Sequence, residues 1–427
     1  MGYPRWKVVL LLAAALGVSA TVIGCMTPTV SGVLLVPSGQ PQSTDSSAEP
    51  GDGLTAAIND FGLELVLAAS TGEKTNVIVS PLSVHAALSM TANGATGETA
   101  EQMREVLRTD TMSPEDANAQ WALLLTGLAS RDTSQKLEIA NSLWAREDVS
   151  FKKPFVDADR DYFGAQVSTL DFEKDDVAAA INGWVSKNTH AMITHIVNEV
   201  PDNAILYLAN AVYFEGDWVT PFAHEATNEQ PFTRSDGSRV DVEMMNSVQQ
   251  MPYYESAALQ ATKLTYKGDA TACYVMLPKQ GVSLDAALAT VEGTGFAKMR
   301  ESMTSRGATE VIFGLPKLNA DFSTDLKEPL SSMGMPRAFD SGQAQFSDMA
   351  DLPVPIYIGK VLHKAKTKVD ERGTVAAAAT VVEMLMGSAA SVTEPPRIVC
   401  DRPYAFAIVD ERSGAMLFLG TINDPNE

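Results

Sequence analysis

The residues best suited to catalysis are few in this chain, and their spacing matches no familiar catalytic pattern. The 427 residues include five histidines and three cysteines. No histidine stands in an HExxH pattern or near a cysteine pair at zinc-ligand spacing. The sequence also lacks a G-x-S-x-G nucleophile turn, a phosphate-binding loop and a G-x-G-x-x-G turn. We therefore expect no enzyme active site, no metal and no cofactor.

A different chemistry is indicated by residues 369–396, VDERGTVAAAATVVEMLMGSAASVTEPP. Four alanines favour helix, the surrounding valines and threonines favour strand, and the final Gly, Ser and Pro residues favour loop. Gly373 permits a bend at the start. Read as a strand with period two, one face begins small and becomes larger: Thr374, Ala376, Ala378, Thr380, Val382 and Met384. The segment suits either an inserted strand or an exposed, cleavable loop, although an alanine-rich connector is the simpler interpretation.

The surrounding sequence predicts an α+β domain in which helices come early and strands come late. Ser80 is a plausible N-cap for a helix that begins at Pro81. The run AILYLANAVYF, residues 204–214, is nearly continuous apolar sequence and predicts a strand buried on both faces. Residues 403–422 predict two strands joined by a turn at Glu411–Gly414. Because strands and helices do not alternate, a doubly wound parallel sheet is not expected.

The N-terminus has the composition of an export signal. Arg5 and Lys7 precede an apolar run and then small residues, and this run is too short to be interpreted first as a membrane span. The sequence Val-Ile-Gly-Cys ending at Cys25 resembles the lipobox of bacterial lipoproteins, which implies that Cys25 is lipidated. We predict a lipoprotein signal peptide over residues 1–24, a flexible lipid-anchored tether over 25–52 and one domain over 53–427. This places the chain on the cell envelope, at the cell surface or the periplasmic face.

The charge of the chain limits the classes of partner that it is expected to bind. The net charge is −21 and the acidic residues are scattered, which argues against nucleic acid as a partner. We expect membrane contact through the lipid anchor only, and a monomer.

Cys273 and Cys400 both lie in apolar runs, so we favour buried free thiols over a disulfide.

Six segments, in order along residues 53–424, resemble blocks of the serpin family. VLHKAKTKVDERGTVAAAAT resembles the serpin hinge, and DRPYAFAIVDERSGAMLFLGTINDP resembles the C-terminal signature. The other four are IVSPLSVHAALSMTANGA, INGWVSKNTHAMI, NAVYFEGDWVTPF and LPKLNADFSTDLKEPLSSMGM. The resemblance implies a single large domain with three β-sheets, eight or nine helices and an exposed reactive-centre loop over about residues 371–396.

By the same resemblance, the protein is a suicide inhibitor of serine or cysteine proteases. The protease cuts the loop, and the freed hinge inserts as an extra strand of the central sheet while the acyl-enzyme is still intact. The hinge residues implied are Glu371, Gly373, Thr374, Ala376, Ala377, Ala378, Ala379 and Thr380. We favour Met386-Gly387 as the cut bond, with Gly387-Ser388 and Met384-Leu385 as alternatives. Leucine and methionine near the cut suit the apolar pockets of chymotrypsin-like, elastase-like or subtilisin-like proteases. Trypsin-like targets are not expected, because the loop has no Arg or Lys between Val375 and Glu394.

The resemblance also assigns residues that control insertion. Ser80, Ser83, Asn210 and His363 match the shutter, where the central strands part. Trp218 and Lys317 match the breach, where the hinge enters, and an ion pair between Lys317 and Glu371 is expected there.

Two other functions remain open. A non-inhibitory serpin could act as a binding or carrier protein, although its hinge would more often hold charged, proline-rich or bulky residues. An unrelated enzyme or solute-binding lipoprotein is disfavoured by the absence of catalytic patterns and by the six blocks.

Overall fold

The computed structural model describes residues 6–16, 33–36, 51–70, 76–129, 135–173, 176–201, 203–374 and 394–427. These residues form one α+β domain with nine α-helices and three β-sheets, as the sequence predicts. None of the helices in these ranges is long and apolar enough to cross a membrane.

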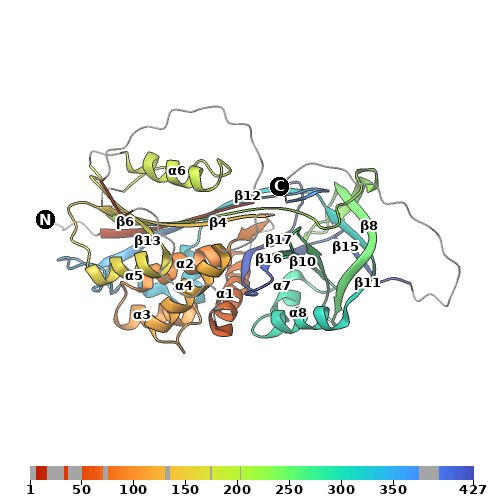
Figure 1. The fold of residues 1–427 in the computed structure, drawn as a ribbon, viewed down its shortest axis with the longest axis horizontal. Coiled ribbons are helices and arrows are strands. Elements are labelled where there is room, and N and C mark those ends of the chain that lie inside the picture. Colours follow the sequence, from red (N-terminus) through yellow and green to blue (C-terminus); the bar gives the residue numbers. More distant parts are fainter. Residues whose placement is uncertain are drawn as a thin grey trace.

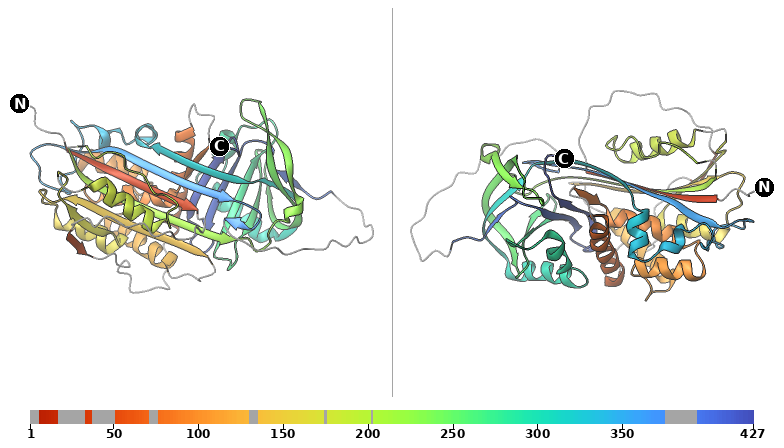
Figure 2. Two further views of the ribbon diagram at one scale, coloured as in Figure 1. Left: turned by 90° about the horizontal axis from the view of Figure 1, so that it is seen from above. Right: turned by 180° about the vertical axis from the view of Figure 1, so that it is seen from behind.

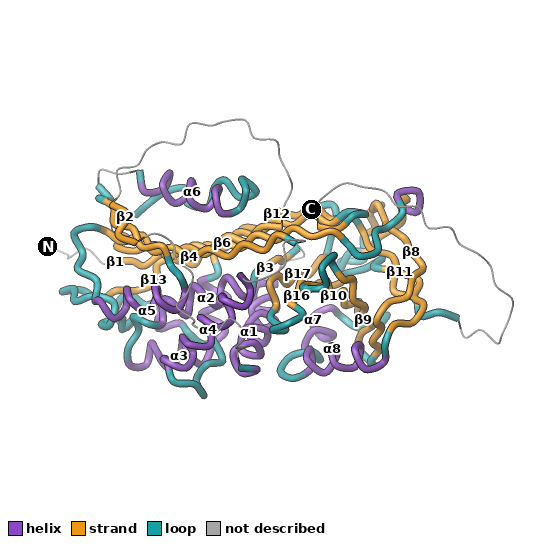
Figure 3. Tube along the Cα trace, viewed as in Figure 1, coloured by secondary structure: helices purple, strands orange, loops and turns teal. Residues whose placement is uncertain are grey.

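The helices divide between the two faces of the largest sheet. Helices α2, α4 and α5 lie on one face, and α6 lies alone on the opposite face (Figures 1 and 3). Ser80 caps α2 by accepting a hydrogen bond from the Ser83 amide, as predicted. The helices are α1 (Asp52–Ser70), α2 (Pro81–Ala92), α3 (Gly97–Val106), α4 (Pro114–Ala129), α5 (Lys153–Phe163), α6 (Val177–Asn188), α7 (Leu284–Ala289), α8 (Gly295–Arg306) and α9 (Lys327–Met333).

The largest sheet, sheet A, holds the strands that matter for insertion. Its strand order is β12 (Leu318–Asp325), β13 (Ile356–Val369), β1 (Trp6–Leu16), β6 (Ala204–Asp217), β4 (Lys136–Arg146), β5 (Gln166–Leu170) and β2 (Val33–Val36). A short strand, β14 (Gly373–Thr374), pairs with the end of β6. The β6 strand is buried along almost its whole length, which confirms the prediction from its apolar sequence.

The other two sheets share one long strand, β8 (Arg239–Glu255). Its first part pairs with β7 (Thr227–Thr233) and β11 (Ala308–Pro316), and its end pairs with β9 (Leu259–Thr265). Strand β15 (Arg397–Val399) extends the first group. Strands β10 (Thr271–Pro278), β16 (Tyr404–Asp410), β17 (Met416–Ile422) and β3 (Val77–Val79) extend the second. The predicted hairpin is present as β16 and β17, and Gly414 in its turn has a φ of 77°.

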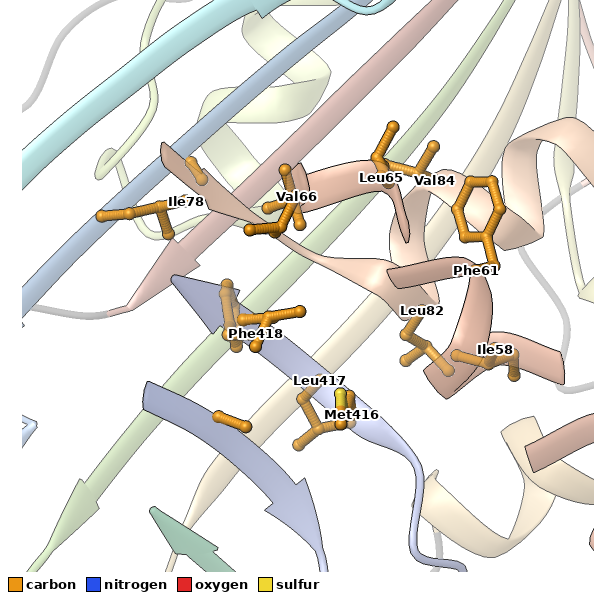
Figure 4. Close-up of a cluster of buried hydrophobic side chains, with 14 of the residues drawn as sticks. Ile58, Phe61, Leu65, Val66, Ile78, Leu82, Val84, Met416, Leu417 and Phe418 are labelled. Carbon is orange, nitrogen blue, oxygen red and sulfur yellow. The ribbon is translucent and has the colours of Figure 1, made fainter. Parts of the chain in front are cut away.

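The main hydrophobic core joins sheet A to these C-terminal strands. Side chains of α1, α2, β3 and β17 meet in it, among them Phe61, Val66, Ile78 and Phe418 (Figure 4). A second cluster packs α6 onto sheet A. Both clusters belong to one folded body, in agreement with the absence of an internal linker in the sequence.

The two cysteines of the domain are buried and unpaired, which confirms the preference for free thiols. Burial raises the pKa of the Cys273 thiol to about 12 and raises the pKa of Cys400 strongly as well.

Two N-terminal segments pair with sheet A. Trp6–Leu16 forms β1 between β13 and β6, and Val33–Val36 forms β2 beside β5 (Figure 2). The signal peptide and tether stay predictions, and Cys25 lies outside the described residues.

Candidate functional site at the base of the loop

Gly373 lies against the end of β6 at a position that only glycine fits. Its φ is 153°, in the region that side chains rarely adopt. A Cβ built on Gly373 would be 2.3 Å from the carbonyl oxygen of Gly216. The bend predicted from sequence therefore also brings two backbones into close contact.

Thr374 points into the protein interior. It is fully buried, and its Oγ1 is 2.9 Å from the hydroxyl oxygen of Tyr266. Tyr266 in turn stacks on Trp218, with ring centroids 4.3 Å apart. This contact fits the predicted inward face of the hinge, on which Thr374 is the first residue.

Three hydrogen bonds attach residues 370–372, the base of the loop, to the residues that follow β6. The Trp218 amide donates to the Arg372 carbonyl at 2.7 Å, and the Phe222 amide donates to the Glu371 carbonyl at 2.8 Å. The Trp218 indole N–H donates to the Asp370 carbonyl at 3.2 Å. Trp218 is therefore in direct contact with the segment that must move if the hinge is to insert.

Glu371 and Lys317 form the expected ion pair. Nζ of Lys317 is 3.0 Å from Oε1 of Glu371 and 3.1 Å from Oε1 of Glu243. The same Glu371 oxygen accepts from Thr227 Oγ1 at 3.0 Å and lies 3.1 Å from His224 Nδ1.

These contacts decide the charge state of Glu371. Burial alone would raise its pKa, but the hydrogen bonds from Lys317, its own backbone, His224 and Thr227 outweigh burial. Together they hold the pKa of Glu371 at about 2. Lys317 behaves in the complementary way: burial favours its neutral form, yet its two carboxylate partners raise its pKa. The pair is therefore ionised at neutral pH.

The four residues assigned to the shutter are all buried, but they do not form one hydrogen-bonded cluster. Ser80 caps α2, and the hydroxyl of Ser83 has no hydrogen-bond partner among the described residues. The side-chain amide of Asn210 donates to Oδ1 of Asn141 at 2.6 Å. Neither ring nitrogen of His363 has a hydrogen-bond partner in the described part of the chain.

The position of β1 explains this separation. Leu12 of β1 is paired with Asn210 on one side and with His363 on the other. A strand therefore lies between these two residues. Burial lowers the pKa of His363 to about 3, against a smaller opposing effect of the Ile78 backbone, so the ring is neutral.

Sequence reasoning missed several residues of this site. Tyr266, Glu243 and Thr227 contact the hinge or its ion pair, and Asn141 binds Asn210. They lie far from the hinge in sequence, so no local pattern marks them. The predicted hinge residues Ala376, Ala377, Ala378, Ala379 and Thr380, and the candidate bonds within Met384–Ser388, lie outside the described residues.

The part of the chain that the structure describes contains no group of three or more His, Cys, Asp or Glu side chains arranged to hold a metal ion.

Comparisons with known proteins agree with the fold. A model of the family described as serpin (serine protease inhibitor) matches residues 56–425. An uncharacterized serpin-like protein of Thermococcus kodakarensis is 33% identical over 87% of this chain and 85% of its own length. The human leukocyte elastase inhibitor is 29% identical, over 87% of this chain and 99% of the human protein.

Among solved structures, the native state of tengpin, a thermophilic serpin, is similar with a TM-score of 0.80 and 31% identity. The match covers 92% of this chain and 99% of tengpin. The matches in sequence and structure extend over the whole domain that carries the hinge. The chain therefore belongs to the serpin family.

Proposed function

We propose that the protein inhibits serine or cysteine proteases by inserting its cleaved loop into sheet A. The observation that carries this proposal is the hinge itself, because Gly373 and Thr374 already pair with β6 and Thr374 is buried against Tyr266. The residues that follow, Val375 to Thr380, are small or β-branched, and none is charged. A hinge of this composition can enter a buried sheet without placing a charge inside it.

Insertion gives the trap its free energy. Each new hydrogen bond of the ladder contributes on the order of 1 kcal/mol net. A dozen such bonds, with the accompanying side-chain burial, favour the inserted form by ~10 kcal/mol or more. The uncut loop is attached at both ends and cannot enter fully, so the active form is held kinetically. Cleavage frees one end, and the acyl-enzyme is carried along before it hydrolyses.

The loop sequence supports proteases with apolar specificity pockets as targets. We place the cut at Met386-Gly387. The absence of Arg and Lys from Val375 to Glu394 argues against trypsin-like enzymes.

The N-terminal sequence supports attachment of the inhibitor to the cell envelope. Removal of residues 1–24 and lipidation of Cys25 would leave the domain on a tether, where it protects the envelope from proteases outside the cell.

The test uses the processed protein, purified from the envelope of the producing cell. It is mixed with chymotrypsin, elastase and subtilisin and separated on denaturing gels. A covalent complex and a released C-terminal peptide are expected, and the mass of the peptide identifies the cut bond. Trypsin serves as the comparison and should give little complex. Cleavage without complex for every protease tested would contradict inhibition and would favour a binding or carrier role.

A further inference from the structure

Sheet A has an internal position that the N-terminal segment fills. Strands β6 and β13 run parallel to β1, which lies between them (Figure 2). Lys7–Leu16 pairs with 204–214 on β6, and Trp6–Ala15 pairs with 356–366 on β13. A strand with partners on both sides can satisfy its backbone groups on both edges.

The sequence of β1 suits this central position. Trp6–Leu16 reads WKVVLLLAAAL, with Lys7 as its one charged residue. A strand covered on both faces needs a nearly continuous apolar sequence. Helix α6 covers one face of sheet A and α2 the other, so the position requires such a strand (Figure 1).

The hinge and β1 use the same edge of β6, one directly after the other. Thr374 is paired with Gly216, and Leu16 is paired with Phe214. The hinge can therefore advance along β6 only by displacing β1. The same is true of β13, because β1 covers it from Ile356 to Lys366.

We propose that residues 6–16 act as a built-in blocking strand: a folded chain that retains them is cut by proteases as a substrate, and loss of the segment makes the chain an inhibitor. This inference rests on the proposed inhibitory function and adds its regulation. The predicted signal peptide, residues 1–24, contains the whole of β1. Its removal would therefore empty the insertion position when the protein reaches the envelope, and chains that fold before export would spare the proteases of their own cell.

The experiment compares three full-length chains that all carry Cys25→Ser, which prevents lipidation. One has the natural leader, and one carries Leu12→Pro in the middle of β1. Proline removes a backbone N–H and is excluded from a central strand. The matched control carries Ser19→Pro, which lies beyond the end of β1.

The first measurement is loop insertion, followed by Tm before and after limited cleavage of the loop. The Leu12→Pro chain should gain thermal stability after cleavage, whereas the natural-leader and Ser19→Pro chains should not. On gels with elastase or chymotrypsin, Leu12→Pro should form covalent complex and the other two should be cleaved without it. A gain in Tm for all three chains, or for none, overturns the inference.

The second measurement is amide hydrogen exchange, which does not depend on inhibition or on how well the variant folds. The amides of Val8–Leu16 should exchange slowly in the natural-leader chain. Exchange as fast as in a free peptide would overturn the inference directly. Failure of the processed protein to form complex, with β1 protected and insertion blocked as expected, would instead count against the proposed function.

Discussion

Gly373 and Thr374 fill a space at the end of β6 that leaves little room for larger side chains. A Cβ on Gly216 would also be tight, at 2.9 Å from both Phe214 and Tyr266. Two glycines therefore let the loop base approach the strand, and Thr374 closes the contact with its hydroxyl. A larger or charged side chain at residue 373 or 374 would therefore collide with β6 or lose the buried hydrogen bond to Tyr266.

On the proposed inhibitory function, Thr374→Arg should convert the protein from an inhibitor into a substrate. The guanidinium would have to be buried beside Tyr266, where an uncharged threonine hydroxyl now lies, and this burial costs several kcal/mol. Because ~1.4 kcal/mol in a barrier is a factor of ten in rate, slower insertion lets the acyl-enzyme hydrolyse first. The measure is the moles of inhibitor consumed per mole of protease inactivated.

Thr374→Ser is the matched control, because it keeps the hydroxyl and should keep inhibition close to normal. Full complex formation by the arginine variant would show that inhibition does not require residue 374 to stay buried beside β6.

Two different kinds of contact hold the base of the loop, residues 370–372, against the chain around the end of β6. Backbone hydrogen bonds from Trp218 and Phe222 fix the path of residues 371–372, and the Lys317–Glu371 ion pair fixes one side chain. The ion pair lies partly buried, with 13% of the Glu371 side chain exposed, so it is less screened by water than a surface pair.

Lys317→Met should weaken the attachment of the loop base to Trp218 and Phe222 without unfolding the domain. Loss of the ammonium leaves Glu371 with weaker partners, and we expect faster amide exchange at Trp218 and Phe222, the two amides that bind the loop base. Glu243→Gln is the control: Glu243 also binds Lys317, but 63% of its side chain is exposed, so exchange should change little. Unaltered exchange at both amides in Lys317→Met would remove the holding role of the pair.

The sequence predicts the elements around the site better than the contacts within it. The apolar run of β6, the α2 cap at Ser80 and the β16–β17 hairpin follow from local patterns, and the Lys317–Glu371 pair follows from the family resemblance. Tyr266 could not be predicted, because its contact with Thr374 joins residues 108 positions apart. The separation of Asn210 from His363 was also unforeseen, because it depends on a strand from the far N-terminus.

For the whole molecule, buried histidines make stability depend on pH. Burial lowers the pKa of His363 to about 3 and that of His85 to about 4, from 6.5 in an unfolded chain. Above pH 6.5 both are neutral in both states and contribute no pH dependence. As the pH falls below 6.5, the unfolded chain takes up protons that the folded chain does not, so the free energy of unfolding decreases. Asp159, whose pKa burial raises, acts in the opposite sense.

His363→Gln should reduce this acid sensitivity. Between pH 6 and 4.5, each such histidine lowers the free energy of unfolding by up to ~1.4 kcal/mol per pH unit. Removal of one titrating ring should make the slope shallower by that amount, whatever the stability of the variant at neutral pH. Urea unfolding at several pH values measures the slope, and His195→Gln, at an exposed position, is the control. Equal slopes in both variants would show that folding does not lower the pKa of His363.

The reactivity of the two buried thiols can be used to detect opening of the strands around them. With their pKa values raised, Cys273 and Cys400 present almost no thiolate at neutral pH, and burial keeps reagents away from both. An aromatic disulfide such as Ellman's reagent should therefore react with Cys273 only when β10 separates from β9 or β16, and with Cys400 only when the chain after β15 separates from β11. A rearrangement confined to sheet A should leave both thiols unreactive, whereas global unfolding exposes both. The rate of thiol modification would therefore distinguish the two events.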